Sequence, residues 1–315
     1  MKKSNKHFLQ NTIVLAVLAS FCCMLWGSAF PFIKIGYSLL QIGSADTASQ
    51  ILFAGVRFFV AGLLTVSAGS VIQRKWLRPS KDSFKRIVPL GLVQTVAQYL
   101  FFYIGLAHTD GTRASIINGT NVFLALLVSC FVFKCEKFTT AKLAGCLVGF
   151  AGIVAINLSG GAVQGGSFTG DACIIASVIA HSFSSSMIKI YSSKDDPVML
   201  SGWQFSFGGA VMIIAGLLCG GRLELSSWQG AAVLAELALV SAIAYTVWGL
   251  LLKYNEVSRV LVFGCLTPVF GFFMSAALLG ENNALSWQSL LALALVCSGI
   301  VIINLKAKEK EKAMP

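Results

Sequence analysis

The chain has 315 residues, of which 56% are hydrophobic and 12% charged, and its mean hydropathy is +0.79. Soluble domains carry about 25% charged residues, so this composition excludes a soluble globular protein and predicts an integral membrane protein. The formal charge of +11 is not accompanied by a soluble region of interleaved basic and aromatic residues, which excludes a nucleic-acid-binding module.

Apolar runs of about 20 residues, the length that a helix needs to cross a bilayer, recur from end to end of the chain. Charged residues, Gly, Pro and Asn separate ten of them. In chain order the predicted spans cover 12–37, 51–72, 87–107, 113–134, 140–158, 170–191, 198–219, 229–252, 257–280 and 286–305. A backbone in lipid must satisfy its own hydrogen bonds, so we predict an all-α membrane protein with ten transmembrane helices.

The basic residues fall mainly on one side of these spans. If the N-terminus is cytoplasmic, twenty Lys and Arg lie at the cytoplasmic ends, and three, Lys34, Arg113 and Arg222, at the opposite ends. Because cytoplasmic loops of membrane proteins are enriched in Lys and Arg, this asymmetry predicts that both termini are cytoplasmic. We expect a multi-pass protein of the cell (plasma) membrane.

The second half of the chain repeats the first. GIVAIN at 152–157 returns as GIVIIN at 299–304, which is 147 positions later. The same offset aligns AGVRF at 54–58 with SGWQF at 201–205. Repetition at one fixed offset indicates two copies of a single structural unit.

Two five-helix repeats and a short tail therefore make up the predicted domain organisation. The first repeat covers 12–158, the second covers 170–305, and a basic cytoplasmic tail covers 306–315. A duplicated unit with an odd number of spans must enter the membrane from opposite sides. The two repeats are thus predicted to be inverted relative to each other.

Short motifs at corresponding places in this pattern resemble a known family. They are WGSAFP at 26–31, RF at 57–58, PVF at 268–270 and GE at 280–281. In this order around the duplication they resemble the EamA-type transporters of the drug/metabolite transporter superfamily, over essentially the whole chain. Asn121 departs from the pattern, since the second repeat has Pro268 at the equivalent place. The resemblance implies a secondary transporter, commonly an exporter of amino acids and related metabolites, with a central cavity between the repeats.

Three ionisable residues stand out well inside predicted spans, where lipid excludes charge unless it faces a cavity or a partner. Arg57 could hold a substrate carboxylate, or could bond to carbonyl groups of a neighbouring helix. His181 could line the cavity or couple transport to protons, or be a neutral histidine bonded to Ser or to a carbonyl. Glu236 could balance the charge of Arg57 or take up a proton.

A stripe of polar side chains predicts where the cavity lies. Gln94 and Gln98 share one face of the third span, and the offset of 147 places Ser241 and Tyr245 at the same two positions of the eighth. Hydrogen bonding between packed helices is the alternative explanation of the stripe. The predicted substrate-binding residues are Trp26, Arg57, Gln94, Gln98, Tyr99, Asn121, His181, Gln204, Ser241, Tyr245 and Trp248, and the predicted coupling residues are His181 and Glu236.

Motifs of enzymes and cofactor sites are missing from the sequence. It contains no Gly-x-Ser-x-Gly or HExxH motif and no phosphate-binding glycine loop, and its nine cysteines lack the spacing of a metal site. We therefore expect no enzyme activity, no cofactor and no metal. The expected partners are a small-molecule substrate and the lipid bilayer, with no nucleic acid and possible proton coupling, and the protein is expected to be a monomer or a homodimer.

The predicted function is export of an amino acid or related small polar metabolite by alternating access at the central cavity. A channel, or an exporter of drug-like cations, is the alternative. The cation exporter is the weaker of the two, because the first predicted span carries no acidic residue.

Overall fold

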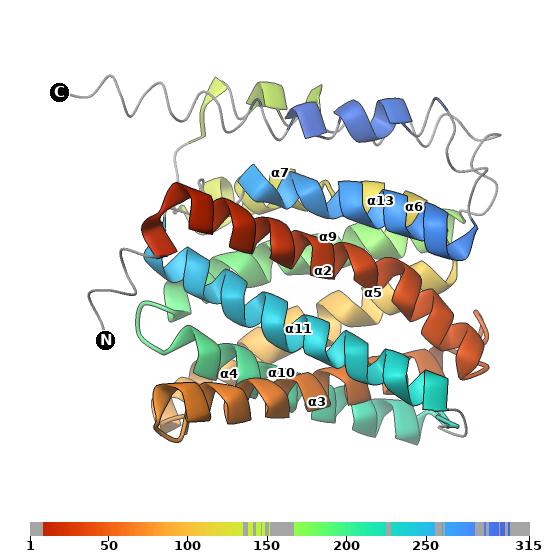
Figure 1. Ribbon diagram of the computed structural model, residues 1–315, viewed down its shortest axis with the longest axis horizontal. Coiled ribbons are helices and arrows are strands. Elements are labelled where there is room, and N and C mark those ends of the chain that lie inside the picture. The colour runs from red at the N-terminus through yellow and green to blue at the C-terminus, as the bar shows by residue number, and fades with distance from the viewer. Residues whose placement is uncertain are drawn as a thin grey trace.

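The computed structural model describes residues 9–134, 167–224, 228–255 and 262–280, and shorter stretches between 138 and 151 and between 260 and 302. Every regular element in these parts is helical (Figure 1). The first of the repeated hexapeptides, most of the second, the basic tail, most of the predicted fifth span and part of the tenth lie outside the described residues.

The described helices follow the order of the predicted spans. They are α2 (Thr12–Leu39), α3 (Thr47–Gln73), α4 (Lys81–Leu90), η1 (Gly91–Ala97), α5 (Gln98–Ala107), α6 (Gly111–Asn118), α7 (Asn121–Leu127), η2 (Val128–Val132), α9 (Phe168–Tyr191), α10 (Pro197–Leu218), α11 (Trp228–Tyr254), η3 (Val262–Cys265) and α13 (Leu266–Leu279). Among the described residues, seven continuous helical stretches are long and apolar enough to cross a membrane. They correspond to predicted spans one to four and six to eight.

Side-chain caps decide where several of these helices begin. Asn11 accepts hydrogen bonds from the first backbone N–H groups of α2, and Asp46 and Ser167 cap α3 and α9 in the same way. Asp196 caps α10, whose first residue is Pro197. Such caps satisfy donors that have no partner inside the helix. For this reason α3 starts at Thr47, four residues before the apolar run from which its span was predicted.

The third span is continuous but not uniformly α-helical. Its middle segment, η1, is a π-helix, in which each hydrogen bond reaches one residue further along the chain than in an α-helix. The fourth span is interrupted between α6 and α7 at Gly119 and Thr120. Both irregular segments are in the middle of the bundle, where π turns and helix breaks often mark functional sites.

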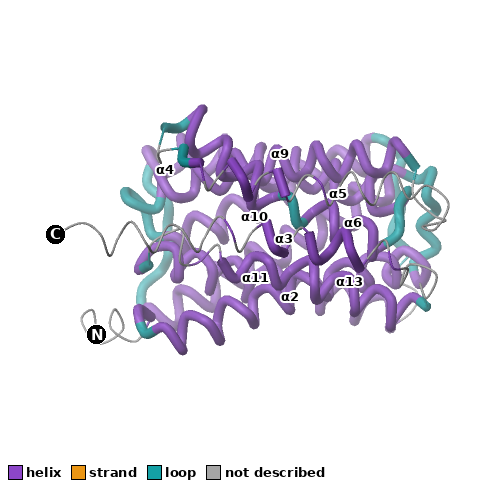
Figure 2. Tube along the Cα trace, turned by 90° about the horizontal axis from the view of Figure 1, so that it is seen from above, coloured by secondary structure: helices purple, strands orange, loops and turns teal. Residues whose placement is uncertain are grey.

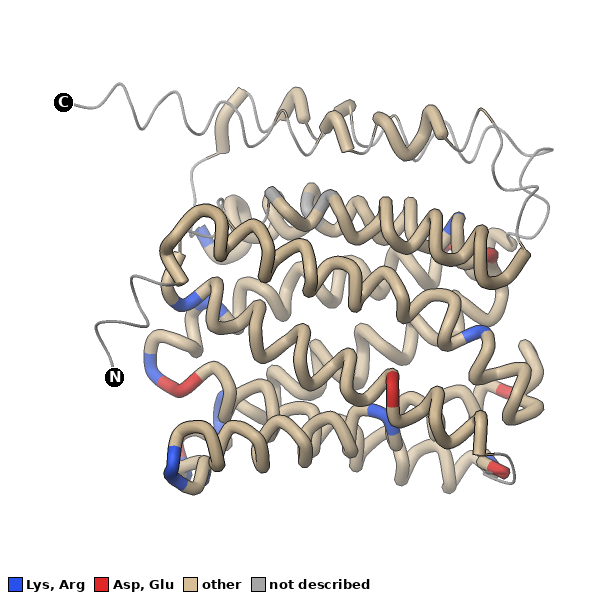
Figure 3. Tube along the Cα trace, in the orientation of Figure 1, with Lys and Arg blue, Asp and Glu red and all other residues tan. Residues whose placement is uncertain are grey.

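The surface has the character of a membrane protein. Figure 2 shows the helices alongside one another with the loops gathered at the two ends of the bundle. Lys, Arg, Asp and Glu lie mainly at these ends (Figure 3). Large apolar side chains such as Val17, Leu63 and Ile214 are exposed between them. This distribution matches a bundle whose outer faces contact lipid.

Hydrogen bonds between helix ends fix the direction of the chain. Tyr37, near the end of α2, donates to the carbonyl oxygen of Tyr103 near the end of α5, so these helices run the same way. Asp195, directly after α9, accepts hydrogen bonds from Ser83 and Arg86 at the start of α4, so α9 runs the opposite way. The first helices of the two predicted repeats, α2 and α9, therefore run in opposite directions.

A glycine seam, formed by Gly55 and Gly62 of α3 with Gly202 and Gly209 of α10, brings two backbones into contact. A Cβ atom on Gly55 would lie 3.0 Å from the carbonyl oxygen of Gly209, and one on Gly62 would lie 2.6 Å from that of Gly202. Adding 147 to the number of each α3 glycine gives one of the α10 glycines, so the offset turns each contact into the other. Only glycine permits this separation.

Candidate transport cavity

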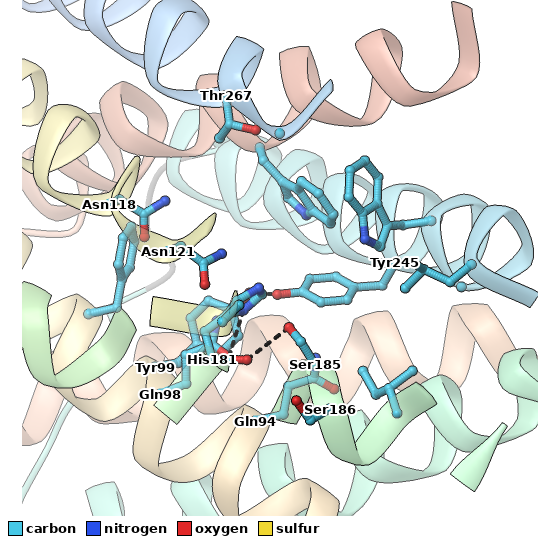
Figure 4. Close-up of a pocket in the computed structure, with 18 of the residues that line it drawn as sticks. Gln94, Gln98, Tyr99, Asn118, Asn121, His181, Ser185, Ser186, Tyr245 and Thr267 are labelled. Carbon is cyan, nitrogen blue, oxygen red and sulfur yellow. Dashed lines mark hydrogen bonds between the residues drawn. The ribbon is translucent and has the colours of Figure 1, made fainter. Parts of the chain in front are cut away.

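A cavity of about 160 Å³ lies inside the bundle, between α2, the third span, α7, α9, α11 and α13. A buried apolar cavity of about 150 Å³ is large enough to bind benzene, so this space can hold a small organic molecule. Figure 4 shows the side chains of Asn118, Asn121, His181 and Tyr245 converging on it. Its lining includes nine of the predicted substrate-binding residues: Trp26, Arg57, Gln94, Gln98, Tyr99, Asn121, His181, Tyr245 and Trp248.

Aromatic rings form one wall of the cavity. The ring of Trp26 lies edge-on to Tyr245, with centroids 5.2 Å apart, and to Trp248, with centroids 5.0 Å apart. The hydroxyl group of Tyr99 is hydrogen bonded to that of Tyr245. Ring contacts of this kind hold the side chains in fixed orientations. The wall is therefore a preformed apolar surface for a ligand.

Three polar atoms of the lining are buried and have no hydrogen-bond partner in the described structure. They are Nε1 of Trp26, Nε2 of Gln94 and Oδ1 of Asn121. Gln94 is only 1% exposed. A buried polar group left without a partner costs about 1–3 kcal/mol, which a ligand with matching groups would recover. The cavity thus offers two donors and one acceptor beside its aromatic wall.

His181 lines the cavity from α9. Its Nδ1 atom lies 3.2 Å from Oε1 of Gln98. The hydroxyl groups of Ser184 and Ser185 donate to the backbone carbonyl of His181 at 2.9 Å, and not to its ring. The sequence left open whether His181 lines the cavity or bonds to Ser or to a carbonyl group. In the structure its ring lines the cavity and is hydrogen bonded to Gln98.

Arg57 is buried between α3 and α11, and its donors point at specific acceptors. Nε donates to the carbonyl oxygen of Leu237 at 3.0 Å, Nη2 to Oγ of Ser241 at 2.9 Å, and Nη1 to the hydroxyl oxygen of Tyr103 at 2.7 Å. The side chain is 2% exposed. Bonding to a neighbouring helix, one of the two readings of Arg57, is therefore present.

Glu236 lies near enough to Arg57 for the two charges to attract each other. No direct salt bridge joins them, and Oε2 of Glu236 is buried without a hydrogen-bond partner in the described structure. Leu237 and Ser241, on the same helix as Glu236, accept hydrogen bonds from the guanidinium group instead. Glu236 does not line the cavity, and its balancing of the Arg57 charge stays a prediction.

Two predicted substrate-binding residues lie behind the cavity wall and not in it. Gln204 and Ser241 are fully buried and are not part of the lining. Gln204 accepts a hydrogen bond from Thr95, and Ser241 accepts one from Arg57. Both were predicted from the repeat offset, which identifies equivalent positions but not which side chains reach the cavity surface.

Other residues of this region were not predicted. Phe30 and Phe102 add aromatic surface to the cavity, and Lys189 brings a cation to its rim. Away from the cavity, Arg113 and Asp171 form a buried ion pair between α6 and α9. The sequence signal that could have identified this pair is an acidic residue, Asp171, at the start of an apolar span.

The cavity is closed at one end of the bundle. Its lining continues from Trp26 to Lys189 and Leu252, at the last turns of α9 and α11. At the opposite end, the rings of Tyr37, Phe53 and Tyr103 pack together with centroids 5.7–6.2 Å apart. The cavity therefore extends toward the side where the sequence predicts the cytoplasm.

Comparison with known proteins identifies the family. The model of the EamA-like transporter family matches residues 10–158 and again residues 168–305. The chain belongs to the EamA-like transporter family. This agrees with the resemblance carried by the motifs at 26–31 and 268–270.

Transporters of other organisms are similar to this chain over most of their length. An uncharacterized transporter of Archaeoglobus fulgidus is 28% identical over 90% of this chain and 83% of its own. The uncharacterized transporter YvbV of Bacillus subtilis is 25% identical, over 95% of this chain and 94% of its own. A probable amino-acid metabolite efflux pump of Salmonella typhimurium is 22% identical, over 90% and 93%.

A solved crystal structure shares the fold of this EamA-like chain. It superposes with a TM-score of 0.70 at 19% identity and covers 94% of this chain and 98% of that one. The family and these relatives are transporters, which fits the expectation of a non-enzyme in a membrane.

Proposed function

We propose that this EamA-like protein is a secondary transporter that exports an amino acid or a related small polar metabolite. The observation that carries the proposal is the pair of unpartnered atoms, Nε1 of Trp26 and Oδ1 of Asn121, that face a cavity with an aromatic wall. One donor and one acceptor beside apolar surface suit a small molecule with both polar and apolar parts. The Salmonella relative named as a probable amino-acid metabolite efflux pump supports this choice.

Alternating access between two inverted repeats is the proposed mechanism. Three observations on the helices support it: the family matches twice along the chain, α2 and α9 run in opposite directions, and the offset of 147 exchanges the two contacts of the glycine seam. A fourth is that Phe58 stacks on Phe205, the residue 147 positions later, with centroids 5.3 Å apart. Contacts that exchange in this way are those of a two-fold axis.

Charge makes a drug-like cation a poor substrate. The lining contains Arg57 and Lys189 and no Asp or Glu among the described residues. A cation in this cavity would meet like charges and find no counter-ion. A zwitterion or an anion avoids this cost.

A channel would need a path through the bundle. The packed rings of Tyr37, Phe53 and Tyr103 close one end of the cavity, so passage requires a conformational change. A carrier undergoes that change once in each cycle, which favours saturable transport over a steady ion current.

The test of export is untargeted metabolite profiling of the medium around cells that overproduce the protein. The wild type is compared with Gln98→Ala plus Tyr245→Ala, and with Gln73→Ala plus Tyr254→Ala, which makes the same two changes at helix ends. All three are brought to equal membrane abundance. We expect particular amino acids or related compounds to accumulate outside with the wild type and the helix-end variant only. Identical profiles for all three would overturn export through this cavity.

Proton coupling is the proposed source of energy, through His181 or Glu236. Once profiling has named a substrate, vesicles with an imposed pH gradient test it with His181→Gln and Glu236→Gln. The variant that lacks the coupling residue should exchange labelled substrate but not accumulate it. Accumulation at the wild-type level by both variants would exclude both residues.

A further inference from the structure

Two buried amides in the centre of the protein lack hydrogen bonds. Nε2 of Gln94 in η1 and Nε2 of Gln204 in α10 have no partner in the described structure, and the residues are 1% and 0% exposed. The two helices are in direct contact here, because Thr95 donates to Oε1 of Gln204 and a Cβ on Gly91 would lie 3.0 Å from the Gln204 carbonyl oxygen. Two buried donors without a bond, on helices that touch each other, are costly, so their retention needs an explanation.

The repeat offset relates these amides to a pair that is bonded. Adding 147 to Arg57 gives Gln204, and adding 147 to Gln94 gives Ser241. Arg57 donates to Oγ of Ser241 from Nη2 at 2.9 Å and from Nε at 3.2 Å. Arg57 and Ser241 therefore form a hydrogen bond, whereas the residues at the equivalent positions, Gln204 and Gln94, do not.

The two pairs lie close to the centre of the bundle, on opposite sides of it. Arg57 and Gln204 each come one residue before the stacked rings of Phe58 and Phe205, so both lie near the middle of the glycine seam. Arg57 is on the side where α3 begins and Gln204 on the side where α10 begins, and these sides face opposite ends because the two helices run in opposite directions. Arg57 also donates to Tyr103 of the ring cluster that packs at one end, whereas the cavity lining extends to Lys189 toward the other.

We propose that Gln94 and Gln204 are a gating pair. Their amides hydrogen bond to each other when the cavity closes at the Lys189 end, and the bond between Arg57 and Ser241 is then released. Each amide has two N–H donors and a carbonyl acceptor, so the pair can bond reciprocally. The proposal rests on the alternating access of the proposed function and adds the residues that hold each state.

Cysteine accessibility tests the gating pair without any substrate. Ser185→Cys places a thiol in the cavity, and a membrane-impermeant maleimide is added to vesicles from the side where α9 ends. Labelling is read as the excess over the chain with its native cysteines alone. Ser241→Ala weakens the closed end by removing a charge-assisted hydrogen bond from Arg57, which shifts the two-state equilibrium by about ten- to a hundredfold, so we expect labelling to slow accordingly. Tyr103→Phe removes a second bond to Arg57 and should act in the same direction.

The decisive variant combines both changes. Adding Gln94→Leu, or Gln204→Met, to Ser241→Ala removes the bond of the opposite state, so labelling should return to within about twofold of the Ser185→Cys parent. Gln98→Leu is the matched control: it lies one turn along the same helix and loses a bond to His181 that is already formed, so it should not restore labelling.

If the pair is a gate, Ser241→Ala should slow labelling and Gln94→Leu should not, whereas ordinary damage to the fold would change the labelling rate of both variants in the same direction. If Gln94→Leu alone slows labelling as much as Ser241→Ala, or if the double variant is as slow as Ser241→Ala, the gating pair is wrong. Metabolite profiling could fail while these labelling results hold, which would remove the proposed substrate and leave the gate. The reverse outcome would leave export and remove the gate.

Discussion

At the scale of single residues, the cavity depends on which polar atoms already have partners. Trp26 and Asn121 each keep one buried atom unbonded, whereas all three guanidinium nitrogens of Arg57 donate to neighbouring acceptors. An unbonded atom is available to a ligand, and a bonded one holds a helix in place. These are different roles for residues that the sequence placed in a single group.

Trp26→Phe replaces the indole by a smaller aromatic ring and removes the N–H donor. We expect KM for the proposed substrate to rise about two- to tenfold, since one neutral hydrogen bond is lost, with kcat little changed. Trp228→Phe, at an exposed helix end, is the matched control and should leave KM at its wild-type value. Equal KM for wild type and Trp26→Phe would show that the indole nitrogen does not bind the substrate.

Asp195 supplies a prediction about pH, at the loop between α9 and α10. Burial acts to raise the pKa of this carboxyl, but the hydrogen bonds from Arg86 and Ser83 outweigh burial and hold the pKa below its ordinary value. A lowered pKa in the folded protein means that the stabilisation is fully present at neutral pH and is lost as the pH falls.

The corresponding measurement is thermal unfolding of Asp195→Asn beside the wild type, in detergent, from pH 7 downward. The variant should melt at a lower temperature at pH 7, and the difference should shrink below about pH 4, where the wild-type carboxyl begins to take up its proton. A difference that stays constant down to pH 3 would contradict the assignment.

At the scale of helices, the sequence predicted the spans well and their irregularities poorly. Ten apolar runs are visible in the sequence because hydrophobicity is a local property, and seven are described as helices of spanning length. The cap at Asp46 extends α3 beyond its apolar run. The π-helix η1 has no such local signal, since its composition is that of an ordinary apolar helix.

The π-helix η1 changes the register of the third span. A π turn takes up one extra residue, so the side chains that follow it are rotated relative to those of an uninterrupted α-helix. Tyr99, in the first turn after η1, is hydrogen bonded to Tyr245 of α11. The sequence predicted that both residues line the cavity, but that they bond to each other could be seen only in the structure.

The glycine seam gives the prediction for this scale. A Cβ on Gly209 would lie 2.4 Å from the backbone nitrogen of Phe59, so Gly209→Ala forces α3 and α10 apart. We expect a destabilisation of about 1–3 kcal/mol, seen as lower membrane abundance and a lower melting temperature. Gly43→Ala, where a Cβ meets no atom within 4 Å, is the control. Equal melting of both variants would mean that the seam tolerates separation.

At the scale of the whole molecule, the fold and the family could be predicted from sequence, and the cavity in part. Nine predicted residues line it because the repeat offset and the helical period together locate the centre of the bundle. The offset could not separate the wall from the layer behind it, where Gln204 and Ser241 lie. The ion pair of Arg113 and Asp171 was also missed, because it joins helices that are far apart in the sequence.

A thermal-shift screen of the intact protein tests the proposed substrate class. A ligand that binds the folded state stabilises it by about 2.7 kcal/mol at a hundred times its Kd. We expect some amino acids or related zwitterions to raise the melting temperature and lipophilic cations to leave it unchanged. A shift with cations alone would reverse the choice of substrate.

The glycine seam also has a mechanical consequence. With two backbones in contact there and Phe58 stacked on Phe205 between the glycine contacts, no layer of side chains is available to slide or repack. The seam lies along one face of the bundle, and α7 and α13 lie beyond the middle of the bundle from it (Figure 1). In the proposed alternating access the two halves would pivot about this fixed contact, so displacement would grow with distance from it, and α7 and α13 would move further than the helices beside the seam.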